Sequence, residues 1–247
     1  MPARLTGALF TYESHALYVG PLIAAARHKH HAGQVIWAPS GVEVAEENGS
    51  VRRVTLHVVP PHQPHRHGPT EVAAVLWVDR DDLRWHPRAT TLPEVRLDAP
   101  LGRQEAEALA TALLALVTPA AARSEEAQHP AVKRMCRLLD ANAADAEIGV
   151  GQLARQSGLS VRQLRHRFTE TLGINPSSYR RWRRLRGAIL AIERGATLTE
   201  AALAAGFADG AHFSRVFQAQ FGMAPSQAFS SVHFVGPRPE SAGGSRG

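Results

Sequence analysis

The 247-residue chain has a single cysteine, Cys136. One thiol excludes an intrachain disulfide framework, and its position on the apolar side of an expected helix favours a place in a core over a catalytic role. The sequence has no run of about 20 apolar residues, the length that crosses a bilayer. Its first ten residues, MPARLTGALF, lack the apolar segment of a signal peptide. These absences predict a cytoplasmic protein that makes no contact with a membrane.

Acidic residues are scarce in the second half of the chain. Residues 128–230 contain 14 Lys and Arg against 7 Asp and Glu, whereas residues 1–127 contain 12 against 14. A positive charge concentrated in one region indicates a polyanionic partner, of which nucleic acid is the common one. The alternative is a basic face that only contacts solvent.

The pattern of apolar residues changes near residue 100. Residues 15–98 read as short alternating runs broken by Pro, Gly and Asp, which predicts an all-β sandwich or barrel. Residues 103–117 have a helical period, and this helix is expected to pack on the barrel or to contact a second copy of the chain. The sequence therefore predicts a β domain at 1–100, a helix and linker at 101–128, a helical domain at 129–231 and a disordered tail at 232–247. Within the helical domain, helices are expected at 129–142, 150–157, 161–172, 176–194, 198–205, 210–221 and 225–231.

An internal repeat occupies the helical domain. Each copy consists of a short helix, a turn containing glycine, and a second helix with apolar residues four positions apart, as in a helix-turn-helix. Ser160 and Asp209 suit the N-caps of the two second helices. Equivalent positions are Leu153, Gly158, Leu164, Phe168 and Gly173 in one copy and Ala201, Gly206, Phe213, Phe217 and Gly222 in the other.

Long polar side chains lie on the outer face of the first copy's second helix. Arg162, Gln163, Arg165 and His166 are candidates for contact with base edges in a major groove. The helix between the copies, expected over 176–194, spans about 28 Å and carries several arginines. Arg181 and Arg184 are candidate phosphate contacts, which give affinity without sequence information.

The segments LARQSGLSVRQLRHRF, GINPSSYRRWRRLRGAILAIERG and AALAAGFADGAHFSRVFQAQFGMAPSQAF resemble the DNA-binding domain of the AraC/XylS family of transcription regulators. The resemblance covers residues 129–231 and implies a sequence-specific regulator of promoter DNA, not an enzyme, with RNA polymerase as a further partner. It places base-facing positions of the second copy at Gly210, Ala211, Ser214 and Arg215, with His212 beside them. Gly210 and Ala211 have no long polar side chain, so this copy is expected to contact mainly phosphates and thymine methyl groups.

Seven of the 13 histidines lie between positions 28 and 67. His28 and His30 alternate on an expected strand, so both rings share one face, and His65 follows in a neighbouring turn. These segments resemble the two motifs of the cupin barrel, although Gln34 stands nearest the expected acidic position and His62 replaces a glycine. The resemblance makes His28, His30 and His65, with Gln34 as a weaker addition, candidate ligands of a divalent metal. The alternative is a polar pocket without a metal.

The N-terminal domain is interpreted as a sensor for an unidentified small molecule. Trp37, Trp77 and Trp85 are candidate walls of its pocket, with core packing as the alternative for each. Two other functions remain open at this point. One is a regulator without a ligand, whose barrel serves only for dimerisation through residues 103–117. The other is a metal-dependent enzyme fused to a DNA-binding domain.

Overall fold

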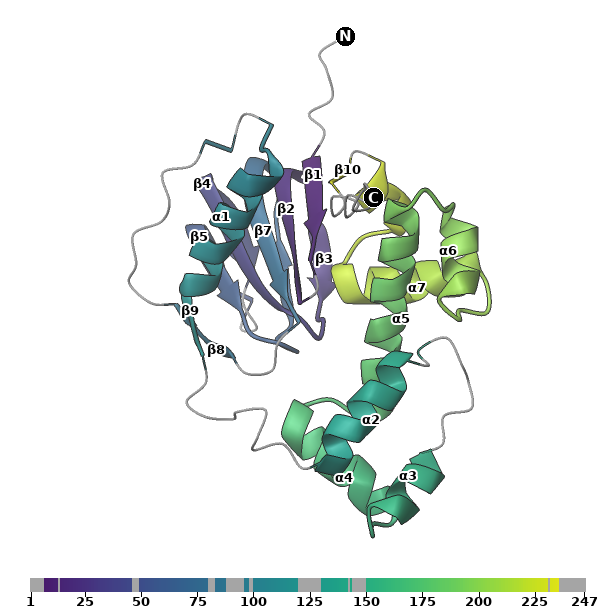
Figure 1. Cartoon of the computed structure of the whole chain (residues 1–247). Coiled ribbons are helices and arrows are strands. Elements are labelled where there is room, and N and C mark those ends of the chain that lie inside the picture. Colours follow the sequence, from purple (N-terminus) through teal and green to yellow (C-terminus); the bar gives the residue numbers. More distant parts are fainter. Residues whose placement is uncertain are drawn as a thin grey trace, which may run out of the picture.

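The computed structural model describes residues 7–12, 14–45, 49–79, 83–87, 96–97, 100–119, 130–141, 143, 150–230 and 232–235. Two parts are visible in Figure 1: a mixed β-sheet with one helix across it, and a group of C-terminal helices. The predicted combination of a barrel-like β domain and a helical domain with two helix-turn-helix units is confirmed.

The large sheet has eight strands in the order β10-β1-β2-β7-β4-β6-β3, with β5 pairing β4 outside this path. Neighbouring strands run antiparallel, except that β10 runs parallel to β1. The bounds are β1 Gly7–Thr11, β2 His15–Leu22, β3 Ala25–His28, β4 Gly33–Ala45, β5 Val51–Val59, β6 His65–His67, β7 Thr70–Val78 and β10 Val232–Val235. Strands β8 (Leu83–Pro87) and β9 (Val117–Pro119) form a separate pair.

The alternation of residues along the central strands divides the sheet into two buried faces. On β4, Val35 and Trp37 join one cluster, whereas Ile36 and Ala38 join another. Strand β7 does the same with Leu76 on the first face. This period of two is the geometry that the alternating runs in the sequence predict. Both faces need a cover, because both are apolar.

Helix α1 (Arg103–Ala115) covers the first face (Figure 1). Leu109 and Leu113 are fully buried there, together with Ala106, Ala110 and Leu116, against Phe10, Leu17 and Leu76 of the sheet. The apolar side of the predicted helix therefore packs on its own barrel. The alternative, contact of that side with a second copy, is wrong for these residues, because no apolar surface of Leu109 or Leu113 remains exposed.

The helical domain contains α2 Pro130–Ala141, α3 Val150–Gln156, α4 Val161–Leu172, α5 Pro176–Glu193, α6 Leu198–Ala204, α7 Gly210–Phe221 and α8 Pro225–Phe229. Each lies within two residues of its expected bounds. The predicted N-caps are also confirmed: Ser160 Oγ accepts the Gln163 amide, and Asp209 Oδ1 accepts the His212 amide. Among the helices in the described part of the chain, none combines the length and apolar composition needed to cross a bilayer.

Strand β10 corrects the sequence prediction for the C-terminus. Residues 232–235 were expected to belong to a disordered tail, but they pair with residues 7–10 of β1 in the N-terminal sheet. The chain thus returns from the helical domain to the β domain, and Val235 packs against the core beside α1. Its carbonyl also accepts a hydrogen bond from Arg103 at 2.9 Å. The remainder of the predicted tail lies outside the described residues.

The packing of α1 gives a first prediction. Leu113→Ala should lower the free energy of unfolding by about 2–5 kcal/mol, because the deletion leaves a cavity in a fully buried site. Leu203→Ala on α6, where the side chain is 55% exposed, should change it by less than about 0.5 kcal/mol. Urea unfolding followed by circular dichroism measures both. Unchanged stability of Leu113→Ala with loss of a dimer would instead show that this face contacts a second copy.

Candidate functional site

The first helix-turn-helix unit consists of α3 and α4. Leu164 and Phe168 of α4 are fully buried against Leu153 and Ala154 of α3, which fixes the angle between the helices. The turn contains Gly158 with a φ of +65°, and the matching Gly206 between α6 and α7 of the second unit has a φ of +80°. This left-handed conformation explains why both copies of the repeat carry glycine at the turn.

The outer face of α4 presents the predicted base-reading residues to solvent. Arg162 and Arg165 are exposed. Gln163 is exposed too, but its Oε1 accepts the Ser160 amide at 2.9 Å as part of a capping box. His166 Nε2 lies 3.2 Å from Glu170 Oε1, one helical turn further on. Within the part of the chain that the structure describes, Arg162 and Arg165 are therefore the side chains of this face without a hydrogen bond or ion pair inside the domain.

The second unit, α6 and α7, presents shorter side chains. Arg215 is exposed, whereas the Ser214 hydroxyl donates to the Gly210 carbonyl at 2.8 Å within its own helix. The His212 ring packs edge-on against Phe207, with ring centroids 5.4 Å apart. Gly210 and Ala211 add no functional group. Arg215 is thus the long polar side chain on the part of α7 that the sequence assigned to DNA.

Helix α5 connects the two units, and its arginines differ in whether they are exposed or bonded to other parts of the protein. Arg181 is exposed. Arg184 Nε donates to the Ala143 carbonyl at 2.5 Å, so one of its donors is used inside the domain. Arg183 and Arg186, which belong to the same basic run, bind Asp79 at the end of β7 with N···O distances of 3.1 and 3.4 Å. Nothing in the sequence pattern predicts this link from Arg183 and Arg186 to the sensor.

Asp79 is the centre of a small charged group between the domains. Arg183 also reaches Asp140 Oδ1 at 2.8 Å, and the Tyr179 hydroxyl donates to the same oxygen at 3.0 Å. His31 Nε2 lies 3.6 Å from Asp79 Oδ1. Burial lowers the pKa of His31 to about 4, although Asp79 opposes the shift, so this ring is neutral at pH 7 and adds no charge.

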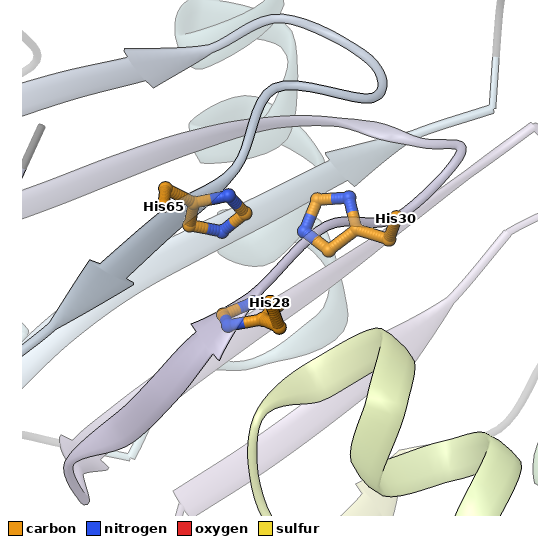
Figure 2. Close-up of side chains that lie close together, drawn as sticks. All are labelled: His28, His30 and His65. Carbon is orange, nitrogen blue, oxygen red and sulfur yellow. The ribbon is translucent and has the colours of Figure 1, made fainter. Parts of the chain in front are cut away.

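Three of the clustered histidines converge as the sequence predicted. Figure 2 shows the rings of His28, His30 and His65 facing one another. Each offers one ring nitrogen such that the three nitrogens lie within 4.8 Å of one another, and all three residues are buried. His28 comes from β3, His65 from β6, and His30 from the segment that follows β3.

The hydrogen bonds of these rings define which nitrogen is available. Nδ1 of His28, His30 and His65 contacts the carbonyls of Ala26, Ala32 and Gln63 at 2.7, 2.6 and 3.0 Å, respectively. A carbonyl only accepts, so each Nδ1 carries the proton and each Nε2 presents a lone pair. Nε2 of His30 and of His65 is buried and has no hydrogen-bond partner among the described residues. A ring N–H held by a backbone carbonyl is the arrangement that orients metal-binding histidines, so the three residues fit a metal ion.

Burial keeps the three rings neutral. It lowers the pKa of His28, His30 and His65 to about 3, and their mutual proximity contributes in the same direction. His62, at the position that the cupin motif gives to glycine, has a φ of +65°. The backbone there adopts the conformation that favours glycine, which accounts for the motif's usual residue.

A cavity of about 240 Å³ lies where the β domain meets the helical domain. Its sensor-side lining includes Tyr12, His28 and Trp77, and its helical-side lining includes Trp182 and Phe221. The position of Trp77 agrees with its prediction as a pocket wall. The sequence gives no such prediction for Trp182, because this residue lies in the basic run of α5. Trp37 belongs instead to the core under α1, and no side-chain placement is described for Trp85.

The domains also touch directly beside this cavity. The Ala26 amide of β3 donates to the Gly222 carbonyl at the end of α7 at 2.9 Å. Gly222 has a φ of +71°, and an added Cβ would meet the Ala26 carbonyl and lie 2.7 Å from His28 Nδ1. Gly173 ends α4 in the same conformation, but the nearest atom to its added Cβ is 3.8 Å away, on His62. The histidine cluster is thus packed against the second unit.

Comparison with known proteins agrees with this geometry. A helix-turn-helix domain family model matches residues 153–231. Two structures of ToxT from Vibrio cholerae share the two-domain fold: an apo variant with a TM-score of 0.55 and 11% identity, and an unsaturated fatty acid-bound wild type with 0.55 and 12%. The alignments cover 91% and 92% of this chain and 100% and 99% of the ToxT chains. A probable AraC family transcriptional regulator from Rhodopseudomonas palustris is 30% identical over 41% of this chain and 96% of its own, with a TM-score of 0.37.

A β-sheet domain joined to two helix-turn-helix units defines a DNA-binding transcription regulator. The chain belongs to the AraC family of these regulators.

The exposed arginines allow base reading and phosphate contact to be separated. Arg165→Ala should reduce binding to the specific operator while leaving random-sequence DNA nearly unaffected, because a base contact is worth about 1–3 kcal/mol of discrimination. Arg181→Ala should weaken both DNAs alike and reduce the slope of log K against log salt by about one. Fluorescence anisotropy across a salt series measures both variants. Equal losses on the two DNAs for Arg165→Ala would contradict its assignment to bases.

Proposed function

We propose that a small molecule bound in the interdomain cavity controls how this regulator binds promoter DNA in the cytoplasm. The observation that carries the proposal is the composition of the cavity wall, which comes from both the β domain and helices α5, α7 and α8. A ligand there contacts the two domains at once. Its affinity then depends on how they are arranged, and by linkage it favours one arrangement over others.

The position of α5 gives such a ligand a route to the DNA-binding units. Trp182, Leu185 and Ile189 of α5 line the cavity, and the same helix joins the first unit to the second. A change in how α5 sits on the sensor therefore changes the placement of both units on DNA. The neighbour ToxT was solved with an unsaturated fatty acid, which supports a small-molecule effector as the class of signal.

The two units are proposed to contribute unequally to recognition. Arg162 and Arg165 of α4 provide planar donors for base edges, with Gln163 and His166 beside them. On α7, Arg215 is proposed to contact phosphate, and the small Gly210 and Ala211 allow close approach to thymine methyl groups. The proposed boundary of the DNA-binding domain is 129–231. RNA polymerase as a partner, and a homodimer that uses the outer side of the 103–117 helix, stay predictions.

The contact at Gly222 allows a test of the coupling. Compounds that raise the melting temperature of the protein are first selected by thermal shift, and each is then assayed for its effect on operator affinity. Gly222→Ala should abolish this effect, because the added methyl group collides with Ala26 and His28 and separates α7 from β3. Operator binding itself should persist, since the substitution lies at the far end of α7 from its DNA face.

Gly173→Ala is the matched control. It imposes the same left-handed strain at the C-cap of α4, of about 1 kcal/mol or more, but it meets no sensor atom closer than 3.8 Å. It should therefore retain the effector response. Loss of the response in both variants, or in neither, would count against control through this interface.

A second proposal concerns the histidine cluster. We propose that His28, His30 and His65 bind a divalent transition metal such as Zn²⁺ through their Nε2 atoms, with Gln34 nearby. Three imidazole ligands suit this class of ion, and the backbone carbonyls on Nδ1 already set the required tautomers.

Metal analysis of protein purified without an affinity tag tests this assignment. About one ion per chain should survive dialysis, and His65→Ala should reduce the metal affinity at least about tenfold. His67→Ala is the control, because His67 is buried on the same strand but is not one of the three convergent histidines. Wild-type protein that retains no ion after incubation with Zn²⁺ and dialysis would overturn the site.

A further inference from the structure

Three hydrogen-bond donors in the wall of the interdomain cavity have no acceptor in the described part of the chain. They are the hydroxyl of Tyr12 and the indole N–H groups of Trp77 and Trp182. Each atom is buried, and Trp182 as a whole is only 8% exposed. A buried donor without an acceptor is unfavourable, because it loses its hydrogen bonds to water without a replacement. A molecule that brings acceptors into the cavity would recover this free energy.

Both indoles lie close to one aromatic ring. The centroid of Phe221 is 6.4 Å from that of Trp77 and 6.1 Å from that of Trp182. Phe217, Met223 and Ile189 extend the apolar wall around them. The cavity therefore presents an apolar surface in which the donors are isolated polar points. This pattern is typical of sites for small organic molecules.

The charged groups of the cavity wall are already paired with one another. Arg186 donates to Asp79 at 3.4 Å and to the Tyr12 carbonyl at 2.9 Å. Arg183, which does not line the cavity, also binds Asp79. Arg186 is the one arginine or lysine among the described residues of the wall, and Asp79 already neutralises it. Burying an unpaired carboxylate here would be costly.

From these observations we infer that the cavity binds a neutral, mainly apolar molecule whose carbonyl, ether or hydroxyl oxygen accepts hydrogen bonds from Tyr12, Trp77 or Trp182. A volume of about 240 Å³ is slightly below the usual lower bound of about 300 Å³ for ligand sites, which favours a small ligand. The inference rests on the proposed control by a ligand in this cavity, and it specifies the chemical class of that ligand.

A pair of probes of equal shape tests the charge preference. Decan-2-one and nonanoate have the same alkyl chain and differ in that a neutral methyl ketone replaces a carboxylate. Isothermal titration calorimetry on the full chain at pH 8, where the acid is ionised, should show the ketone binding at least about tenfold more tightly. Nonanoate binding as tightly as the ketone would overturn the inference and leave control by a small molecule intact. Failure of both probes to bind would also overturn it.

Two tryptophan variants test the donors. Trp182→Phe keeps an aromatic ring but removes the N–H, so it should weaken decan-2-one several-fold. Trp37→Phe is the matched control, because Trp37 is buried in the core under α1 and does not line the cavity. It should leave ketone affinity unchanged. Equal affinity in the two variants would contradict hydrogen bonding by Trp182.

A third variant should bind nonanoate more tightly, a result that loss of folding cannot produce. Asp79→Asn removes the carboxylate that pairs with Arg186 in the cavity wall, whereas Arg183 keeps its ion pair with Asp140. A cation then becomes available at the cavity wall, and nonanoate should bind about tenfold more tightly than it does to the wild type, while the ketone changes little. Asp79→Asn with unchanged selectivity would show that the paired charges do not set the preference. The effector response of Gly222→Ala tests the control function separately, since that experiment makes no assumption about ligand charge.

Discussion

The pairing of Asp79 with Arg183 and Arg186 determines how the two domains of this regulator meet. Asp79 follows the last residue of β7, and its amide donates to the Ser14 carbonyl at 2.8 Å, so the carboxylate is held by the sheet. It is only 12% exposed and accepts from two arginines of one helix. Because that helix is α5, the sensor is fastened to the element that joins both DNA-binding units.

A second link, at the C-terminal end of α5, fixes the direction of the helix. The hydroxyl of Thr11 donates to the Glu193 carboxylate at 2.8 Å, and Arg186 reaches the Tyr12 carbonyl. Contacts near residues 183, 186 and 193 extend over roughly three turns, since each turn contains about 3.6 residues. A helix held at several points over this length can pivot little without breaking a charged or hydrogen-bonded contact. The cavity lies against the same stretch, so its occupant acts where the domains are most constrained.

The local structure of the DNA-binding domain could be predicted from the sequence, whereas the contacts between the β domain and the helical domain could not. The repeat fixes helices, glycine turns and N-caps because each depends on neighbouring residues: Ser160 caps α4 and Asp209 caps α7 through contacts three residues away. His28 is the last residue of β3, whereas His30 lies in the segment after it, so the convergence of these two rings does not follow from the expected strand alternation. Asp79 and Arg183 are 104 positions apart, and no periodic pattern connects them. The return of residues 232–235 to β1 depends likewise on pairing with a distant strand.

The dependence on distant contacts also explains why the sequence does not identify Trp182 as part of the cavity wall. In the sequence it is one apolar residue among five arginines, and an amphipathic helix facing DNA accounts for it. In the fold, Arg181 of α5 is exposed to solvent, whereas Trp182 lines the interdomain cavity. Different faces of one helix therefore meet solvent and the sensor. His28 lies at the meeting point of the three features, because it lines the cavity, belongs to the convergent histidines and borders Gly222. Linkage then requires that a metal ion and a ligand that both contact this ring alter each other's binding free energy by equal amounts. The second helix-turn-helix unit packs on that ring, so binding of the metal ion or of the ligand would act directly on this unit.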